Sequence, residues 1–126
     1  MVKEIITPTP EVADRYTIAL LKIERLDKDQ IDLEEMQRQV NYYREGLNLD
    51  DKDMSNLVDA LYEINGKMWD AEHAIRKGQD NQLGLEEIGK RAIKIRDLNK
   101  IRMKIKNDII DLTGDGFKDC KMNYSK

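Results

Sequence analysis

The stretch LEEIGKRAIKIRDLNKIRMKIKNDIIDLT, residues 85–113, decides the fold class of this chain. Its apolar residues recur at intervals of three and four, which is the period of one face of an α-helix. They are Ile88, Ala92, Ile95, Leu98, Ile101, Ile105, Ile109 and Leu112. Gly114 follows, a residue suited to the left-handed conformation that ends many helices. The stretch therefore predicts one long helix from Leu85 to Thr113, buried along this row.

A second long helix is predicted before it, beginning after Asp50 or Asp53 and ending at Gly78. Its buried row is expected to contain Met54, Val58, Leu61, Met68 and Ile75. The linker QDNQLG, residues 79–84, is short, so the two long helices should run antiparallel. Gly66 lies inside this helix and costs roughly 1 kcal/mol against alanine, unless a neighbour packs closely there.

Two shorter helices are predicted nearer the N-terminus. In the first, Thr9 is expected as the N-cap and Pro10 as the first helical residue. Its apolar row contains Val12, Tyr16, Ala19, Ile23 and Leu26. The second should run from Asp32, which forms a capping pair with Glu35, to Gly46. Its apolar face is thin, with Met36, Val40 and Tyr43.

These elements predict an all-α fold, an antiparallel helical bundle of about four helices. The long hairpin of the third and fourth helices should dominate it. Residues 1–126 are expected to form a single domain, with an irregular N-terminal segment (1–9) and an irregular C-terminal tail (114–126). Because the thin apolar face of the second helix can cover little of the long hairpin, apolar stripes of the hairpin should stay exposed. Another subunit would cover them, so a homo-oligomer is expected.

Composition excludes several classes of function. The net charge is −3, so the basic footprint of a nucleic-acid-binding protein is missing. The sequence contains no apolar run long enough to span a bilayer. Residues 1–10 lack the apolar run of a signal peptide, so none is expected. With one histidine, His73, and one cysteine, Cys120, a zinc site is not expected. We expect a soluble cytoplasmic protein without a metal or other cofactor and without a nucleic-acid or membrane partner.

Polar residues form stripes beside the apolar rows. Tyr62, Asn65, Trp69, Glu72 and Arg76 follow a three–four spacing in the third helix. Similar stripes are expected in the fourth and first helices. Together they give these candidate ligand-binding residues: Arg15, Lys22, Arg25, Asn65, Trp69, Glu72, Arg76, Arg96, Asn99, Arg102 and Lys106.

The stripes have three interpretations. They are a buried network of ion pairs and amides that fixes the register of the helices, or a cationic pocket for an anion, or a solvated charged face. In a pocket, the basic side chains would bind phosphate or carboxylate groups, and Trp69 would stack on a ring or sugar.

Most of these candidate residues, together with Asp14, Thr17 and Ile18, form a pattern that resembles known families. In DRYTIALLKIERL (14–26) they are Asp14, Arg15, Thr17, Ile18, Lys22 and Arg25; in INGKMWDAEHAIR (64–76) they are Asn65, Trp69, Glu72 and Arg76; in residues 85–109 they are Asn99, Arg102 and Lys106. This pattern resembles domain-of-unknown-function families with members in bacteria and marine viruses. The resemblance implies an all-helical fold and, for a viral member, a location in the host cytoplasm. It implies no assigned activity.

The sequence thus favours a non-catalytic binding or assembly module that holds a small anionic ligand, such as a sugar phosphate or nucleotide. One alternative is an enzyme acting on a phosphorylated sugar, a nucleotide or a dicarboxylate, with Glu72 as acid or base. The other is a purely structural bundle that binds proteins.

Overall fold

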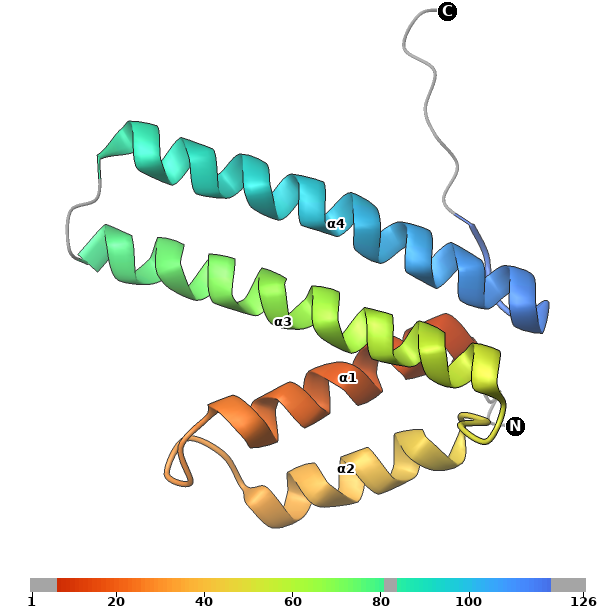
Figure 1. Ribbon diagram of the computed structural model, residues 1–126. Coiled ribbons are helices and arrows are strands. Elements are labelled where there is room, and N and C mark those ends of the chain that lie inside the picture. Colours follow the sequence, from red (N-terminus) through yellow and green to blue (C-terminus); the bar gives the residue numbers. More distant parts are fainter. Residues whose placement is uncertain (1–6, 81–83, 119–126) are drawn as a thin grey trace, which may run out of the picture.

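The computed structural model describes residues 7–80 and 84–118, apart from the side chains of residues 75 and 77–80. This part of the chain forms four helices: α1 (Thr9–Arg25), α2 (Leu33–Glu45), α3 (Lys52–Asp80) and α4 (Leu85–Thr113). No strand occurs in it, so the predicted all-α fold is confirmed. In Figure 1, α3 and α4 lie side by side as a long antiparallel hairpin, with α1 and α2 below it.

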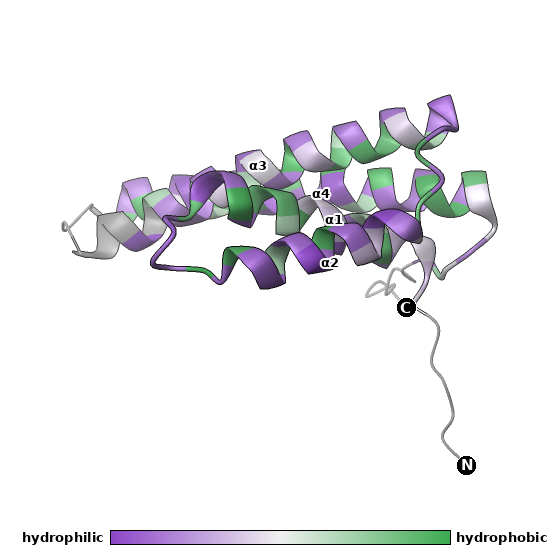
Figure 2. Ribbon diagram, turned by 90° about the horizontal axis from the view of Figure 1, so that it is seen from below, coloured by the Kyte–Doolittle hydropathy of each residue, from purple (hydrophilic) through white to green (hydrophobic). Residues whose placement is uncertain are grey.

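The hairpin is longer than the helices that cover it. Figure 1 shows α1 and α2 beneath the end of the hairpin where α3 begins and α4 ends, and α1 reaches as far along α3 as Asp70, which pairs with Arg25. Hydrophobic and hydrophilic residues alternate along each helix in Figure 2, as in amphipathic helices. The shared core includes Leu61 of α3 and Ile109 of α4, both fully buried.

Helix α1 is buried on two sides, because it lies between α2 and the hairpin. The predicted row with Val12 and Tyr16 faces α2: Val12 lies next to Gly46, and Tyr16 next to Arg44. A second buried row, which the apolar period did not predict, contains Ala13, Asp14, Thr17 and Leu21. This row faces α3, where Leu21 lies next to Gly66.

The helix ends confirm some predictions and correct others. The Asp32 side chain accepts from the backbone N–H of Glu35 at 3.1 Å, and Gly114 ends α4 with φ of 70°. Thr9 is not the N-cap of α1, since it is already helical and Pro8 precedes it. Asp115 instead accepts hydrogen bonds from the Thr9 backbone N–H (2.8 Å) and hydroxyl (2.7 Å). The start of α1 is thereby capped by the turn that follows α4.

Two further predictions about the hairpin were wrong. Helix α3 does not end at Gly78 but continues to Asp80. In α4, Ala92, Ile101 and Leu112 are exposed rather than buried, because only one side of this helix meets α1 and α3. Phe117, which follows α4, is 92% exposed. The side chain of Ile75, predicted in the buried row of the third helix, lies outside the described part.

Gly66 has the close neighbour that its position predicted. A Cβ atom built there would lie 3.0 Å from a guanidinium nitrogen of Arg25 and 3.6 Å from Leu21. The Gly66 carbonyl also accepts a hydrogen bond from Arg25 at 3.2 Å. The glycine therefore allows α1 to approach α3 closely, which accounts for a residue of poor helix propensity in mid-helix.

Candidate functional site

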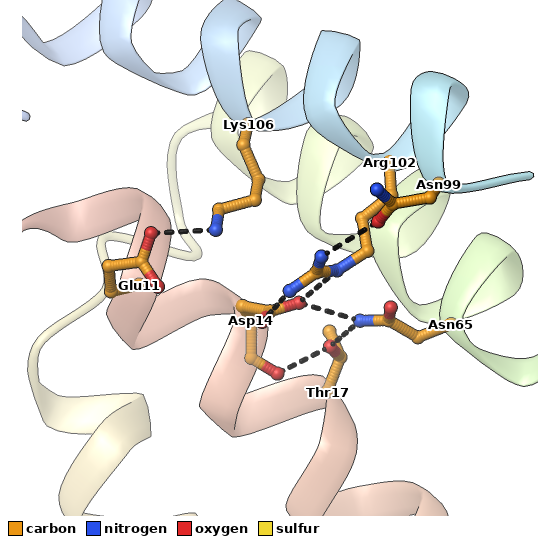
Figure 3. A network of polar contacts seen from close by, with 7 residues as sticks. All are labelled: Glu11, Asp14, Thr17, Asn65, Asn99, Arg102 and Lys106. Carbon is orange, nitrogen blue, oxygen red and sulfur yellow. Dashed lines mark hydrogen bonds and ion pairs between the residues drawn. The ribbon is translucent and has the colours of Figure 1, made fainter. Parts of the chain in front are cut away.

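The polar stripes meet where the N-terminal half of α1 crosses the hairpin. Figure 3 shows two acidic residues of α1 opposite two basic residues of α4. The Asp14 carboxylate accepts from Arg102 Nε at 3.1 Å and from Arg102 Nη2 at 2.5 Å, a two-point ion pair. The ammonium of Lys106 lies 2.6 Å from a carboxylate oxygen of Glu11. Both basic residues are thus bound by acids of the same chain.

Helix α3 contributes Asn65, which is buried beside Asp14. Its Nδ2 group donates to Asp14 Oδ1 and to the hydroxyl oxygen of Thr17, both at 2.9 Å (Figure 3). The Thr17 hydroxyl in turn donates to the backbone carbonyl of Asp14 at 2.9 Å. On the outer side, Asn99 Oδ1 accepts from Arg102 at 3.1 Å. We call these seven residues the α1–hairpin network: Glu11, Asp14, Thr17, Asn65, Asn99, Arg102 and Lys106.

Burial and hydrogen bonding act in opposite directions on the Asp14 carboxyl. Burial alone would raise its pKa, because it disfavours the charged form. The hydrogen bonds from Arg102 and Asn65, together with the positive charges of Arg102 and Lys106, outweigh burial and lower the pKa of Asp14. The hydrogen bond to Asp14 raises the pKa of Arg102 against its own burial, and Glu11 and Glu72 contribute further. The pair therefore stays ionised in the folded protein.

The internal pairing decides what this cluster can do chemically. Asp14 Oδ1 accepts two hydrogen bonds and Oδ2 accepts one, and its pKa is lowered, so this carboxylate is a poor general base near neutral pH. An anionic ligand at Arg102 would have to displace Asp14. Of the three interpretations of the stripes, the geometry at Asn65, Arg102 and Lys106 matches the buried network that fixes register.

The remaining candidate residues do not join this network. Arg25 forms an ion pair with Asp70 on the side of α1 that faces Gly66. Arg76 lies 3.7 Å from Glu72, one turn away on α3. Four other candidates have no hydrogen bond to the α1–hairpin network in the described part: Arg15 and Arg96 are exposed, whereas Lys22 and Trp69 are partly buried. The predicted set is thus only partly brought together.

An open hollow of about 460 Å³ lies next to Arg25, between α1 and α3. It is lined by Arg25, Asp59, Tyr62, Glu63, Gly66, Lys67 and Asp70. Arg25 alone of the predicted ligand-binding residues is among them. The lining mixes both signs of charge, and the Tyr62 hydroxyl donates to Glu24. This hollow is therefore not the cationic pocket that the stripes suggested.

Sequence reasoning missed Glu11, Asp14 and Thr17 as members of the site. Asp14 and Thr17 were part of the resemblance pattern, but the candidate set contained only basic residues of the first helix. A signal was present: Glu11 and Asp14 are one turn apart, as are Arg102 and Lys106. The spacing places each pair on one face of its helix, but it does not say which two faces meet.

Within residues 7–80 and 84–118, no group of three or more His, Cys, Asp or Glu side chains is placed to hold a metal ion. None of the helices described there is long and apolar enough to cross a membrane. No family model, no curated protein and no solved structure matches this chain. The resemblance to domain-of-unknown-function families therefore stays a prediction.

Proposed function

We propose that this protein is a non-catalytic assembly module, a rigid helical bundle that associates with further copies of itself. The observation that carries the proposal is the internal pairing of Arg102 with Asp14 and of Lys106 with Glu11. Because this pairing occupies Arg102 and Lys106, we infer that the α1–hairpin network serves to hold α1 on the hairpin. Binding is then left to the outer surface of the bundle.

The outer surface supports association. Helix α4 exposes Leu85, Ile93, Ile101 and Leu112, each by at least two fifths of its surface. In the described part of the chain, no third helix lies against the end of the hairpin away from α1 and α2 (Figure 1). A chain of 126 residues buries only a modest core alone, and association is a common way for such a chain to gain stability.

A second candidate function is the binding of a small anion, which the sequence favours. What supports it is that Lys22, Arg76 and Arg96 lie outside the α1–hairpin network, so their charges are not matched by Glu11 and Asp14. Arg76 is already close to Glu72, however, and an anion would compete with that carboxylate. An enzyme acting through Glu72 remains an alternative, for which turnover lost in Glu72→Gln would be the evidence.

Native mass spectrometry of freshly purified protein tests the proposal. The expected result is a defined oligomer that carries no small-molecule adduct. A monomer that retains an anionic mass would contradict the assembly function and support the ligand function. Inorganic phosphate is the probe for the latter: the melting temperature of an assembly module should not respond to phosphate beyond its response to the same ionic strength of chloride. We further propose that the module acts in the cytoplasm and without nucleic acid. The net charge of −3 supports the absence of a nucleic-acid partner.

A further inference from the structure

An open groove of about 1060 Å³, the α1–α2 groove, lies between the end of α1 and the first half of α2. Ile23 and Leu33 give it apolar surface, and Leu33 is 45% exposed. Its charged lining consists of three acids and one base, which are Asp32, Glu34, Glu35 and Arg38. The groove is open and exceeds the roughly 300–1,000 Å³ of small-molecule sites. Its size therefore suits a helix laid along it.

Part of the negative charge of the α1–α2 groove is already used within α2. Asp32 accepts from the backbone N–H of Glu35 at 3.1 Å, and the Glu35 carboxylate lies 2.9 Å from the one base of the lining. Glu34 is exposed and has no ion pair or hydrogen bond with another side chain in the described part of the chain. Asp27 and Asp29, in the connection that leads from α1 to α2, are also exposed. The groove therefore suits a partner that presents apolar and basic side chains together.

Helix α4 of the same chain presents such a surface on the side away from the core. Its core side carries Leu98 and Ile109, which are buried. Exposed residues on the other side recur at intervals of three and four, and four of them are lysines: Lys90, Ile93, Lys94, Asp97, Lys100 and Lys104. We call this set the α4 outer face. Ile93 is 51% exposed, and Lys94 and Lys100 have no ion pair with another described residue.

We propose that the α4 outer face of one copy docks in the α1–α2 groove of the next copy. The inference rests on the proposed assembly function and names its interface. Its basis is charge complementarity: residues 27–35 contain five acids and one base, whereas residues 90–104 contain seven bases and one acid. Lysines beside Ile93 thus meet carboxylates beside Leu33, so that opposite charges surround an apolar contact.

The two surfaces belong to opposite edges of the molecule. In Figure 1, α4 forms one edge and α2 the other. Among the described helices, α2 packs on α1 and does not contact α4. The α4 outer face of a chain therefore cannot reach the groove of the same chain, and each copy offers one of each to its neighbours. Association is head-to-tail, and a defined oligomer requires that these contacts close into a ring.

Sedimentation velocity over a concentration series tests this interface with two charge reversals. Glu34→Lys places a base in the groove opposite the lysines, and Lys94→Glu places an acid opposite the groove. We expect each to raise the Kd of association at least about tenfold, because like charges that meet across an interface repel. The controls Asp59→Lys and Lys52→Glu change the net charge equally at exposed positions of α3, outside both surfaces, and should leave Kd unchanged. Circular dichroism checks that every variant folds.

Mixing the two reversals makes the test specific for the pairing of groove with outer face. Equal amounts of Glu34→Lys and Lys94→Glu should recover the assembly of the wild type, because every contact in an alternating oligomer then joins opposite charges. Assembly of the wild type should also weaken as sodium chloride is raised, since salt screens exposed charges.

The outcomes separate this interface from the assembly function. An oligomer that neither reversal weakens would overturn the interface and leave the assembly function intact. An oligomer weakened by Lys94→Glu alone would also overturn it, because α4 would then meet a surface other than the groove. A wild-type protein that is monomeric up to millimolar concentration would overturn both.

Discussion

Asp14 and Arg102, 88 positions apart in the chain, form a two-point ion pair that ties α1 to α4. Asp14 is 5% exposed, and Asn65 of α3 donates to the same carboxylate. One buried carboxylate is thus shared by three helices. The hydrogen bonds of this carboxylate form only when both their directions and their distances fit. They therefore fix one register of α1 on the hairpin, whereas apolar packing tolerates several.

Removing one partner of this pair should destabilise the protein strongly. Arg102→Gln leaves the Asp14 charge buried without its counter-charge, which typically costs about 3–5 kcal/mol of the free energy of unfolding. Urea unfolding followed by circular dichroism measures it. Arg96→Gln, at an exposed position on the same helix, is the matched control and should change the free energy of unfolding by less than about 0.5 kcal/mol. Equal effects of the two substitutions would refute a structural role for Arg102.

The pair also predicts how stability depends on pH. The pKa of Asp14 is lowered in the folded protein, so the folded state holds its proton less tightly than the unfolded chain does. The stabilisation by Asp14 is therefore complete above the unfolded pKa of about 3.9 and is lost as pH falls through the folded pKa. Urea midpoints of wild type and Asp14→Asn should converge below about pH 4. A constant difference down to the acid transition would show that Asp14 is not the titrating group.

Gly66 and Arg25 should be energetically coupled. In Gly66→Ala, the new methyl group would lie 3.0 Å from the Arg25 guanidinium, which must move. Alanine gains about 1 kcal/mol of helix propensity, and the displaced Arg25 offsets part of it. We therefore expect Gly66→Ala to stabilise the protein more in an Arg25→Ala background than in the wild type. Identical effects in both backgrounds, measured by thermal unfolding, would mean that the close approach of Arg25 has no energetic weight.

Asp115 should stabilise the start of α1. Its carboxylate accepts two hydrogen bonds from Thr9, which lower the pKa of Asp115. Asp115→Ala should lower the melting temperature, but less than Arg102→Gln does, because the contact is exposed. Hydrogen exchange offers a local readout: the amide of Thr9 should exchange faster in Asp115→Ala, while the amides around Leu61 are unchanged. Unaltered exchange at Thr9 would exclude the cap.

Much of the fold could be predicted from the sequence, because helix period and end signals are local. The bounds of α4, the cap at Asp32 and the hairpin follow from such signals. The cap at Asp115 could not be predicted, since it joins residues 106 positions apart. The exposure of Ile101 and Leu112 depends on the side of α4 against which α1 and α3 pack. The residue pattern of α4 alone does not contain that information.

The candidate site was predicted in part, for a related reason. Asn65, Asn99, Arg102 and Lys106 stand on the correct faces, because the three–four spacing identifies a face. Their partners Glu11 and Asp14 lie on another helix, and no rule of spacing pairs one helix with another. Acids on α1 were therefore overlooked, and the basic stripe suggested an external anion where the chain supplies its own.

The most direct test of this account is a double-mutant cycle on Asp14 and Arg102 in phosphate-free chloride buffer. The free energy of unfolding would be measured for wild type, Asp14→Asn, Arg102→Gln and the double variant. If the two side chains hold each other, the double variant loses less than the sum of the single losses, with a coupling of at least about 1 kcal/mol. Additive losses, or a wild type that reaches full stability only when phosphate is added, would show that Arg102 serves a ligand and would contradict the account.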